Sequence, residues 1–97
     1  MTAKKGYWMA MVDITDPENY PQYIAANKAA FDKYGAKFMA RGGRGEVVEG
    51  PAATRLVIIE FDSYQTAVDC YRSPEYAAAL EIRKKYSVGH VAIVEGV

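Results

Sequence analysis

The chain has 97 residues, of which 51% are hydrophobic and 25% are charged, a composition that indicates one folded domain and excludes a disordered chain. Lys and Arg number 12 and Asp and Glu also number 12, so the net charge is zero, which argues against a dedicated nucleic-acid-binding protein because such proteins need a basic face. The single cysteine, Cys70, cannot form an internal disulfide or a cysteine-rich zinc site, and its apolar neighbours indicate a small core side chain.

The sequence also carries signals about the compartment. No apolar run approaches the roughly 20 residues of a membrane span. The basic residues 1–5 precede an apolar stretch that is too short for a secretory signal. A lone cysteine fits a reducing environment. We therefore expect a cytoplasmic protein whose partners include neither a membrane nor a nucleic acid.

The first third of the chain predicts a strand followed by a helix. Residues 7–14 are almost all aromatic or apolar, which is typical of a buried strand. Asp16-Pro17-Glu18 predicts a helix start, because Asp can cap the helix, Pro suits its first position and Glu complements its dipole. Apolar residues then recur at helical spacing as far as Tyr34, and Gly35 is expected to end the helix in a left-handed conformation.

The middle of the chain predicts two strands. Residues 36–41 predict the second strand, which the glycines of 42–45 are expected to bend and residues 46–49 to continue. After a turn at Gly50-Pro51, residues 55–61 give the clearest strand pattern in the sequence.

The last third predicts a helix and a final strand. Asp62-Ser63 and Ser73-Pro74-Glu75 are both typical of helix starts, so we expect a helix that restarts at a kink and ends in the basic residues 83–85. Residues 88–95 predict the last strand. The order β-α-β-β-α-β over residues 1–97 predicts a single α+β domain that is ferredoxin-like, with an antiparallel four-stranded sheet and two helices on one face.

Both faces of the predicted sheet are apolar. Because side chains alternate across a strand, the first strand places Tyr7, Met9 and Met11 on one face and Trp8, Ala10 and Val12 on the other. Two helices can cover only one face, and the other would be a larger apolar patch than soluble monomers usually expose. We therefore expect a homodimer in which the two sheets pack together. The alternative is that edge loops or the helix kink cover this face.

Several short motifs occur together along the chain: Gly6-Tyr7-Trp8, Asp16-Pro17, Tyr34-Gly35, Phe38-x-x-Arg41-Gly42-Gly43, Ile59-Glu60-Phe61, Ser73-Pro74-Glu75-Tyr76 and Val94-Glu95-Gly96. In this combination the chain resembles the bacterial family called domain of unknown function thirteen-thirty, within the dimeric α+β barrel superfamily, over nearly its whole length. The resemblance implies a ferredoxin-like protomer and a dimer whose two sheets form a barrel. It implies no reaction, because the family has no established activity and the wider superfamily ranges from cofactor-independent monooxygenases to small-molecule isomerases.

Two residues are candidates for proton transfer. His90 is the only histidine, the one side chain that titrates near neutral pH without perturbation. Glu60 lies in an apolar strand, where a buried carboxylate has either a raised pKa or a partner. The alternatives are a structural histidine and an ion pair of Glu60 with Arg55 or Arg83. No metal is expected, because a lone histidine leaves only scattered carboxylates as further ligands.

Four residues are candidates for ligand binding. Arg41 stands in a glycine-rich motif that suits a carboxylate or phosphate, unless it is a solvated side chain at a bend. Asn27 interrupts the apolar stripe of the first helix and could orient a ligand carbonyl or bond to the sheet. Trp8 and Tyr23 are expected to wall a cleft, although aromatic stripes are more often core.

Together these residues predict a pocket between the sheet and the helices of each protomer. His90 or Glu60 would move a proton there, and Arg41 would hold an anionic group. We expect the protein to bind a small aromatic or weakly anionic molecule without a cofactor, and to be either a binding protein or a cofactor-independent enzyme. The alternative is a non-catalytic dimeric structural or binding module. A pocket that contains two titratable groups favours the first, and a pocket filled by its own tyrosines favours the second.

Overall fold

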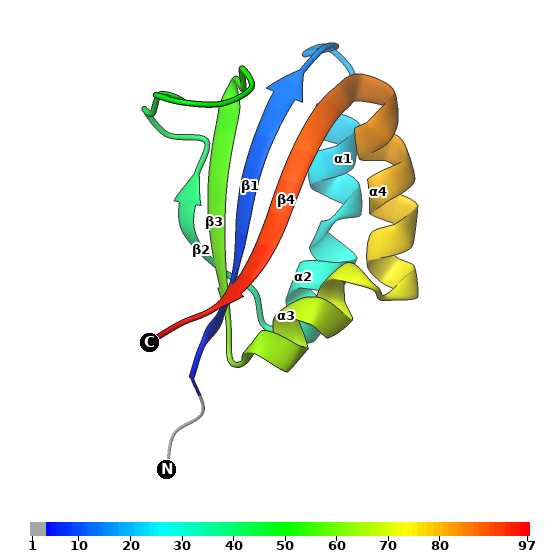
Figure 1. Ribbon diagram of the computed structural model, residues 1–97. Helices are drawn as coiled ribbons and strands as arrows, with labels where there is room; N and C mark the ends of the chain where they lie inside the picture. Colours follow the sequence, from blue (N-terminus) through cyan, green and yellow to red (C-terminus); the bar gives the residue numbers. More distant parts are fainter. Residues whose placement is uncertain (1–3) are drawn as a thin grey trace.

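A computed structural model of the protein describes residues 4–97. Its sheet has four antiparallel strands in the order β2-β3-β1-β4: β1 (Gly6–Ile14), β2 (Lys37–Arg41), β3 (Arg55–Phe61) and β4 (Ser87–Glu95). The helices all lie on one side of this sheet (Figure 1): α1 (Pro21–Ala26), α2 (Lys28–Tyr34), α3 (Tyr64–Tyr71) and α4 (Pro74–Tyr86). This is the predicted ferredoxin-like α+β fold, which is confirmed.

The first helix differs from its prediction at both its start and its middle. The side chain of Asp16 accepts a hydrogen bond from the Asn19 backbone N–H at 3.2 Å, which closes a turn rather than a helix. Regular helix begins at Pro21, which has no N–H to satisfy and therefore fits the first position. At Asn27 the backbone has a ψ of −14°, and the helix divides into α1 and α2. Gly35 ends α2 in the predicted left-handed conformation, with a φ of 67°.

The expected continuation of the second strand over residues 46–49 is wrong. Gly42, with a φ of 69°, donates its N–H to the Leu56 carbonyl at 2.9 Å and then turns the chain out of the sheet. Because β3 begins at Arg55 and pairs with β2 only as far as Arg41, no strand is available to pair with residues 46–49. The irregularity expected at the glycines lies instead within β2, between Phe38 and Ala40.

Two serines begin the helices of the second half, as predicted. The Ser63 side chain accepts a hydrogen bond from the Thr66 N–H at 3.0 Å, and the Ser73 side chain accepts one from the Tyr76 N–H at 3.1 Å. Each serine therefore satisfies a backbone donor that the first helical turn leaves free. The predicted kink between the two helices is the break between α3 and α4. No helix within residues 4–97 is both long and apolar enough to cross a bilayer.

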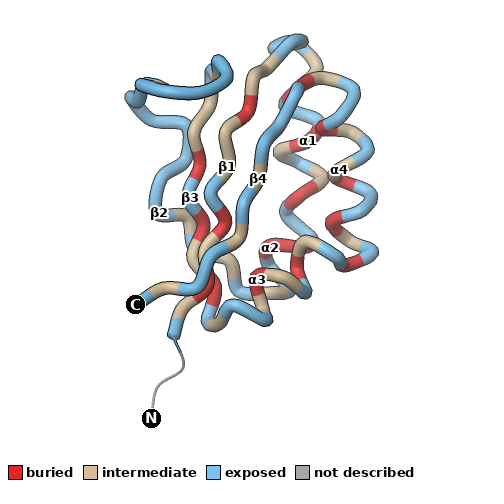
Figure 2. Tube along the Cα trace, viewed as in Figure 1, coloured by how far each residue is buried: buried red, intermediate tan, exposed pale blue. Residues whose placement is uncertain are grey.

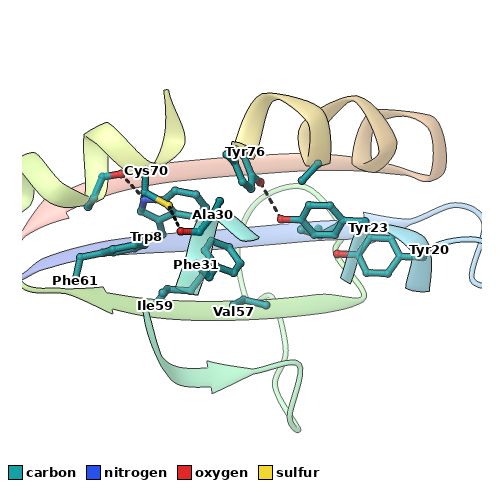
Figure 3. Packing of buried hydrophobic residues seen from close by; sticks show 13 residues of the cluster. Trp8, Tyr20, Tyr23, Ala30, Phe31, Val57, Ile59, Phe61, Cys70 and Tyr76 are labelled. Carbon is teal, nitrogen blue, oxygen red and sulfur yellow. Dashed lines mark hydrogen bonds between the residues drawn. The ribbon is translucent and has the colours of Figure 1, made fainter. Parts of the chain in front are cut away.

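The core lies between the sheet and the helices and is dominated by aromatic rings (Figure 3). Trp8 is at its centre, with the ring centroids of Phe31, Phe61, Tyr71 and Tyr76 4.9–5.4 Å away. Its indole N–H donates to the Ala67 carbonyl at 2.8 Å, so the polar end of the only tryptophan is satisfied. Cys70 is fully buried there, as predicted, and burial raises the pKa of its thiol to about 12.

Each face of the sheet contains the residues that were predicted to lie on it. Directly paired residues lie on the same face, so the register puts Tyr7 with Glu60 and Val94, Met9 with Ile58 and Ala92, and Met11 with Leu56 and His90. We call these nine residues the open face, because no helix lies over them. Figure 2 shows β4 exposed along much of its length, whereas buried residues gather where the strands meet the helices.

Candidate functional site

A cavity of about 30 Å³ lies between the helix-covered side of the sheet and helices α1, α2 and α4. That volume has room for about two water molecules. All four residues predicted to bind a ligand line it, namely Trp8, Tyr23, Asn27 and Arg41. The structure therefore brings together side chains from β1, from α1, from the junction of α1 and α2, and from β2.

Besides the Asn27 amide, tyrosine hydroxyls provide the neutral polar groups of this cavity. The hydroxyl oxygens of Tyr23 and Tyr76 lie 2.8 Å apart and share a hydrogen bond that joins α1 to α4 (Figure 3). Burial is the main cause that raises the pKa of Tyr76, so this phenol stays protonated at neutral pH. The Tyr20 ring packs against Tyr23 with a centroid distance of 5.5 Å.

Three arginines line the cavity, and they come from three different elements. Arg55 begins β3 directly opposite Val12, and Val12 is in turn opposite Gly89 on β4. Arg83, on α4, lies over this Gly89. Arg41 on β2 pairs with Val57, which is two residues after Arg55 on β3. The three arginines therefore line one cavity on the side of the sheet that faces the helices, with the Arg55 guanidinium beside Gly42 next to β2 and the Arg83 guanidinium over β4. The Arg41 guanidinium stacks on the Phe38 ring, 4.0 Å from its centroid.

Arg83 is the most unusual of the three. It is only 6% exposed, and its Nε and Nη1 atoms have no hydrogen-bond partner. The ion pairs within residues 4–97 involve Lys5, Lys28 and Lys33 but none of the cavity arginines. The Arg83 carbonyl accepts a hydrogen bond from the Ser87 hydroxyl at 2.7 Å, which fixes the last turn of α4 and with it the position of the side chain.

An open groove of about 280 Å³ continues from the cavity toward the edge strand β2. It shares five of its seven lining residues with the cavity: Ile24, Asn27, Phe31, Phe38 and Arg41. The two that it adds, Lys28 and Asp32, pair with each other at 2.6 Å, so Arg41 is the charged residue of the groove that has no ion-pair partner within residues 4–97. The groove is thus a wider, half-open entrance to the narrow cavity.

The expectation that Glu60 and His90 face this cavity is wrong. Both belong to the open face, on the opposite side of the sheet, because their strand positions alternate with those of Ile59 and Val91. Glu60 accepts a hydrogen bond from the Tyr7 hydroxyl at 2.9 Å. The ion pairs within residues 4–97 include none of Glu60 with Arg55 or Arg83, so that alternative is also wrong. Glu60 is opposite Tyr7 and His90 is opposite Met11, which separates them by about 13 Å along the strands.

The polar or charged cavity residues that sequence reasoning did not select as ligand contacts are Arg55, Arg83, Tyr20 and Tyr76. The sequence does contain one indication that Arg83 faces the core, because it continues the apolar stripe of α4 that includes Tyr76 and Leu80. A charged residue on a stripe that faces the core is either paired or functional. Within residues 4–97, no group of three His, Cys, Asp or Glu side chains is arranged to hold a metal ion.

Comparison with known proteins gives a family and a fold. The model of the family described as Domain of unknown function (DUF1330) matches residues 5–97. No curated protein matches the sequence. A protein of unknown function from Rhodopseudomonas palustris has a similar structure, with a TM-score of 0.73 and 19% identity over 97% of this chain and 83% of that one.

Two further solved structures are similar. SnoaB, a cofactor-independent oxygenase from Streptomyces nogalater, has a TM-score of 0.65 and 12% identity over 95% of this chain and 92% of its own. A dimeric ferredoxin-like protein of unknown function from Thermobifida fusca has a TM-score of 0.55 and 16% identity over 96% of this chain and 92% of its own. At these identities the likeness shows the fold alone.

Proposed function

This chain belongs to the family described as Domain of unknown function (DUF1330), and we therefore propose a function from its geometry. The protein is a homodimer that binds a small aromatic or weakly anionic molecule between the sheet and the helices. One observation carries the proposal. The cavity combines an aromatic wall with three arginines, while the described part of the chain contributes no Asp or Glu to its lining. A site with unbalanced positive charge and flat apolar walls fits such a molecule.

Binding has better support than catalysis. A proton-transfer reaction needs a group that titrates near the working pH, and no histidine or carboxylate of residues 4–97 lines the cavity. The tyrosines are poor bases or acids there, because burial raises the pKa of Tyr20 and Tyr76. SnoaB is a cofactor-independent oxygenase with a similar fold, but at 12% identity that activity is not carried over to this chain.

The homodimer is proposed from the open face. Met9 and Ile58 on the two central strands and Val94 on the edge strand β4 are 42–45% exposed, although water is a poor neighbour for such side chains. The Thermobifida fusca protein and one from Bacteroides fragilis, both ferredoxin-like, are described as dimeric, which supports the same assembly here. A second copy that packs its own open face on this one would bury both.

The cavity volume supports a second candidate function. At about 30 Å³ the cavity is nearly filled by its own side chains, including the paired Tyr23 and Tyr76 hydroxyls. A protein of this shape that binds nothing would be a dimeric structural module. The two candidates differ in one respect: a ligand-binding protein must let Tyr20 or Tyr23 move to admit a molecule larger than water.

The fluorescence of Trp8 tests the proposal, because it is the only tryptophan and it lines the cavity. Phenol, benzoate and phenylacetate are titrated into the native protein up to millimolar concentrations, with two-dimensional NMR to locate the affected residues. We expect saturable changes at Trp8, Tyr23 and Asn27 with at least one aromatic compound. If none of the three compounds changes the spectra of the free protein, small-molecule binding is rejected and the structural module is the remaining candidate.

A further inference from the structure

We infer that the ligand of this cavity is an organic carboxylate whose carboxylate group binds Arg83. The inference rests on the proposed binding function and adds the chemical class of the ligand and the position of its charged group. Four features of the described residues carry it: charge, unused donors, shape and size.

The positive charge of the cavity has no counter-charge among the described residues. Arg41, Arg55 and Arg83 line one cavity, and neither a carboxylate in the lining nor an ion pair within residues 4–97 balances them. Arg83 is buried, so its uncompensated charge lies in a low-dielectric space and its interaction with the other two positive charges is unfavourable when the site is empty. Arg55 is half-buried and Arg41 is exposed, so solvent weakens their part of this repulsion. An anion in the cavity reverses the sign of that interaction.

The unused donors belong to Arg83. A guanidinium presents two paired edges that match a carboxylate, formed by Nε with Nη2 and by Nη1 with Nη2. The two partnerless atoms, Nε and Nη1, place one unused donor in each edge. Buried polar groups are nearly always bonded, and a buried guanidinium with free donors therefore indicates a missing acceptor.

The shape of the surroundings holds this guanidinium in place. A β-carbon added at Gly89 would collide with Nη1 of Arg83, so the absence of a side chain on β4 provides the space that the group occupies. Tyr20 lines the same cavity, and its pKa is raised mainly by burial, although the charges of Arg55 and Arg83 oppose this rise. Its hydroxyl thus lies within the field of both arginines and is a further donor for an anion.

The size of the cavity separates the charged group from the rest of the ligand. About 30 Å³ accepts a planar carboxylate in place of the roughly two waters that would fit, but not an aromatic ring as well. Arg83 lies over β4, whereas the groove of about 280 Å³ lies beside β2 at the opposite edge of the sheet. A ring next to the carboxylate therefore needs the movement of Tyr20 or Tyr23, and the groove accepts only a longer apolar chain. A phosphate is tetrahedral, carries up to two charges and is more strongly hydrated, so the narrow aromatic cavity favours a carboxylate.

Matched pairs of acid and amide test the inference. Benzoate is compared with benzamide, and phenylacetate with phenylacetamide, by calorimetry and NMR on the native protein, on Arg83→Met and on the control Arg44→Met, whose arginine lies in the exposed 42–54 loop. A charged hydrogen-bonded pair contributes about 1.5–3 kcal/mol, so we expect acids to bind roughly 10- to 150-fold more tightly than amides. That preference should vanish in Arg83→Met and persist in Arg44→Met.

The possible outcomes are distinct. Equal binding of acids and amides to the native protein, or an undiminished acid preference in Arg83→Met, overturns the inference and leaves the proposed function intact. Binding of inorganic phosphate at Arg83 without any acid preference overturns the carboxylate assignment. If no aromatic compound binds, the proposed function itself fails. Gly89→Ala serves as a second variant in case Arg83→Met does not fold, since it keeps the charge but displaces the guanidinium, and it too should abolish the acid preference.

Discussion

Arg83 and Gly89 fit together across the junction of α4 and β4: the guanidinium of Arg83 fills the space that a side chain at position 89 would occupy. The contact brings a charged group over the sheet at a place where an apolar residue would otherwise complete the core. It also explains why a glycine, which weakens a strand, occurs within β4.

Gly89→Ala should destabilise the protein by about 1–3 kcal/mol, because the added methyl group forces the buried guanidinium to move. Gly89 has no left-handed φ, so backbone strain does not contribute. Chemical denaturation measures the change. Gly43→Ala is the matched control: it too lacks a left-handed φ, and a β-carbon there would meet nothing within 4 Å. Equal stabilities of the two variants would contradict the packing described here.

Arg83→Met should stabilise the ligand-free protein by about 1–3 kcal/mol, since Met keeps most of the side-chain volume and removes a buried charge that has no partner. Thermal melting at low salt measures the shift, and Arg44→Met in the exposed loop should change the melting temperature little. A strongly destabilised Arg83→Met would mean that the guanidinium has a stabilising partner in the folded protein.

The hydroxyl pair of Tyr23 and Tyr76 predicts a non-additive double-mutant cycle. Either single Tyr→Phe change should cost about 1–2 kcal/mol, because it leaves one buried hydroxyl without its partner at 2.8 Å. Removing both hydroxyls leaves nothing unsatisfied, so the double variant should be no less stable than the worse single variant. Denaturant unfolding of the four proteins measures this. Strictly additive losses would show that the two hydroxyls do not interact.

Ile58→Lys on the open face should convert the proposed dimer into a monomer. It places a charge in the centre of an apolar face, where a packed second copy could not solvate it. Light scattering should change from twice the chain mass of 10.7 kDa to that mass itself. Ala78→Lys, on an exposed position of α4, is the control and should leave the dimer intact. A native protein that scatters as a monomer would remove the proposal.

Cys70 predicts a loss of stability in alkaline solution. Burial raises the pKa of its thiol from the usual 9.0 to about 12, so between those values the unfolded chain loses a proton that the folded protein keeps. The contribution of this thiol to the free energy of unfolding is therefore fully present below pH 9. It falls as the pH rises toward 12, by at most about 1.4 kcal/mol per pH unit. Urea unfolding of the native protein and of Cys70→Ala, across pH 8–11, should show a smaller alkaline loss in the variant.

The same burial makes Cys70 unreactive. The thiolate is the nucleophile, and the folded protein contains almost none of it near neutral pH. Alkylation by iodoacetamide at pH 8 should therefore be slow in the native protein and rapid in urea. Rapid labelling without denaturant would contradict the burial of this side chain.

Local sequence determined most of the secondary structure. Ser63 and Ser73 cap helices, Gly35 ends one, and the alternation along β1 assigns Trp8 and Met9 to opposite faces, because each of these features depends on neighbours within a few residues. The same alternation already separated His90 from Val91 on β4. It could not tell which of two apolar faces the helices would cover, since both satisfy the same pattern.

Tertiary structure decided the content of the cavity. Arg41, Arg55 and Arg83 are far apart in the sequence and belong to β2, β3 and α4, and only the strand order β2-β3-β1-β4 brings them to one cavity on one face. The same packing put Glu60 and His90 on the other side of the sheet and joined Tyr23 to Tyr76. Periodicity reports which side of its own element a residue occupies, whereas the grouping of charges depends on how separate elements pair and pack, which is set by the global burial of apolar surface.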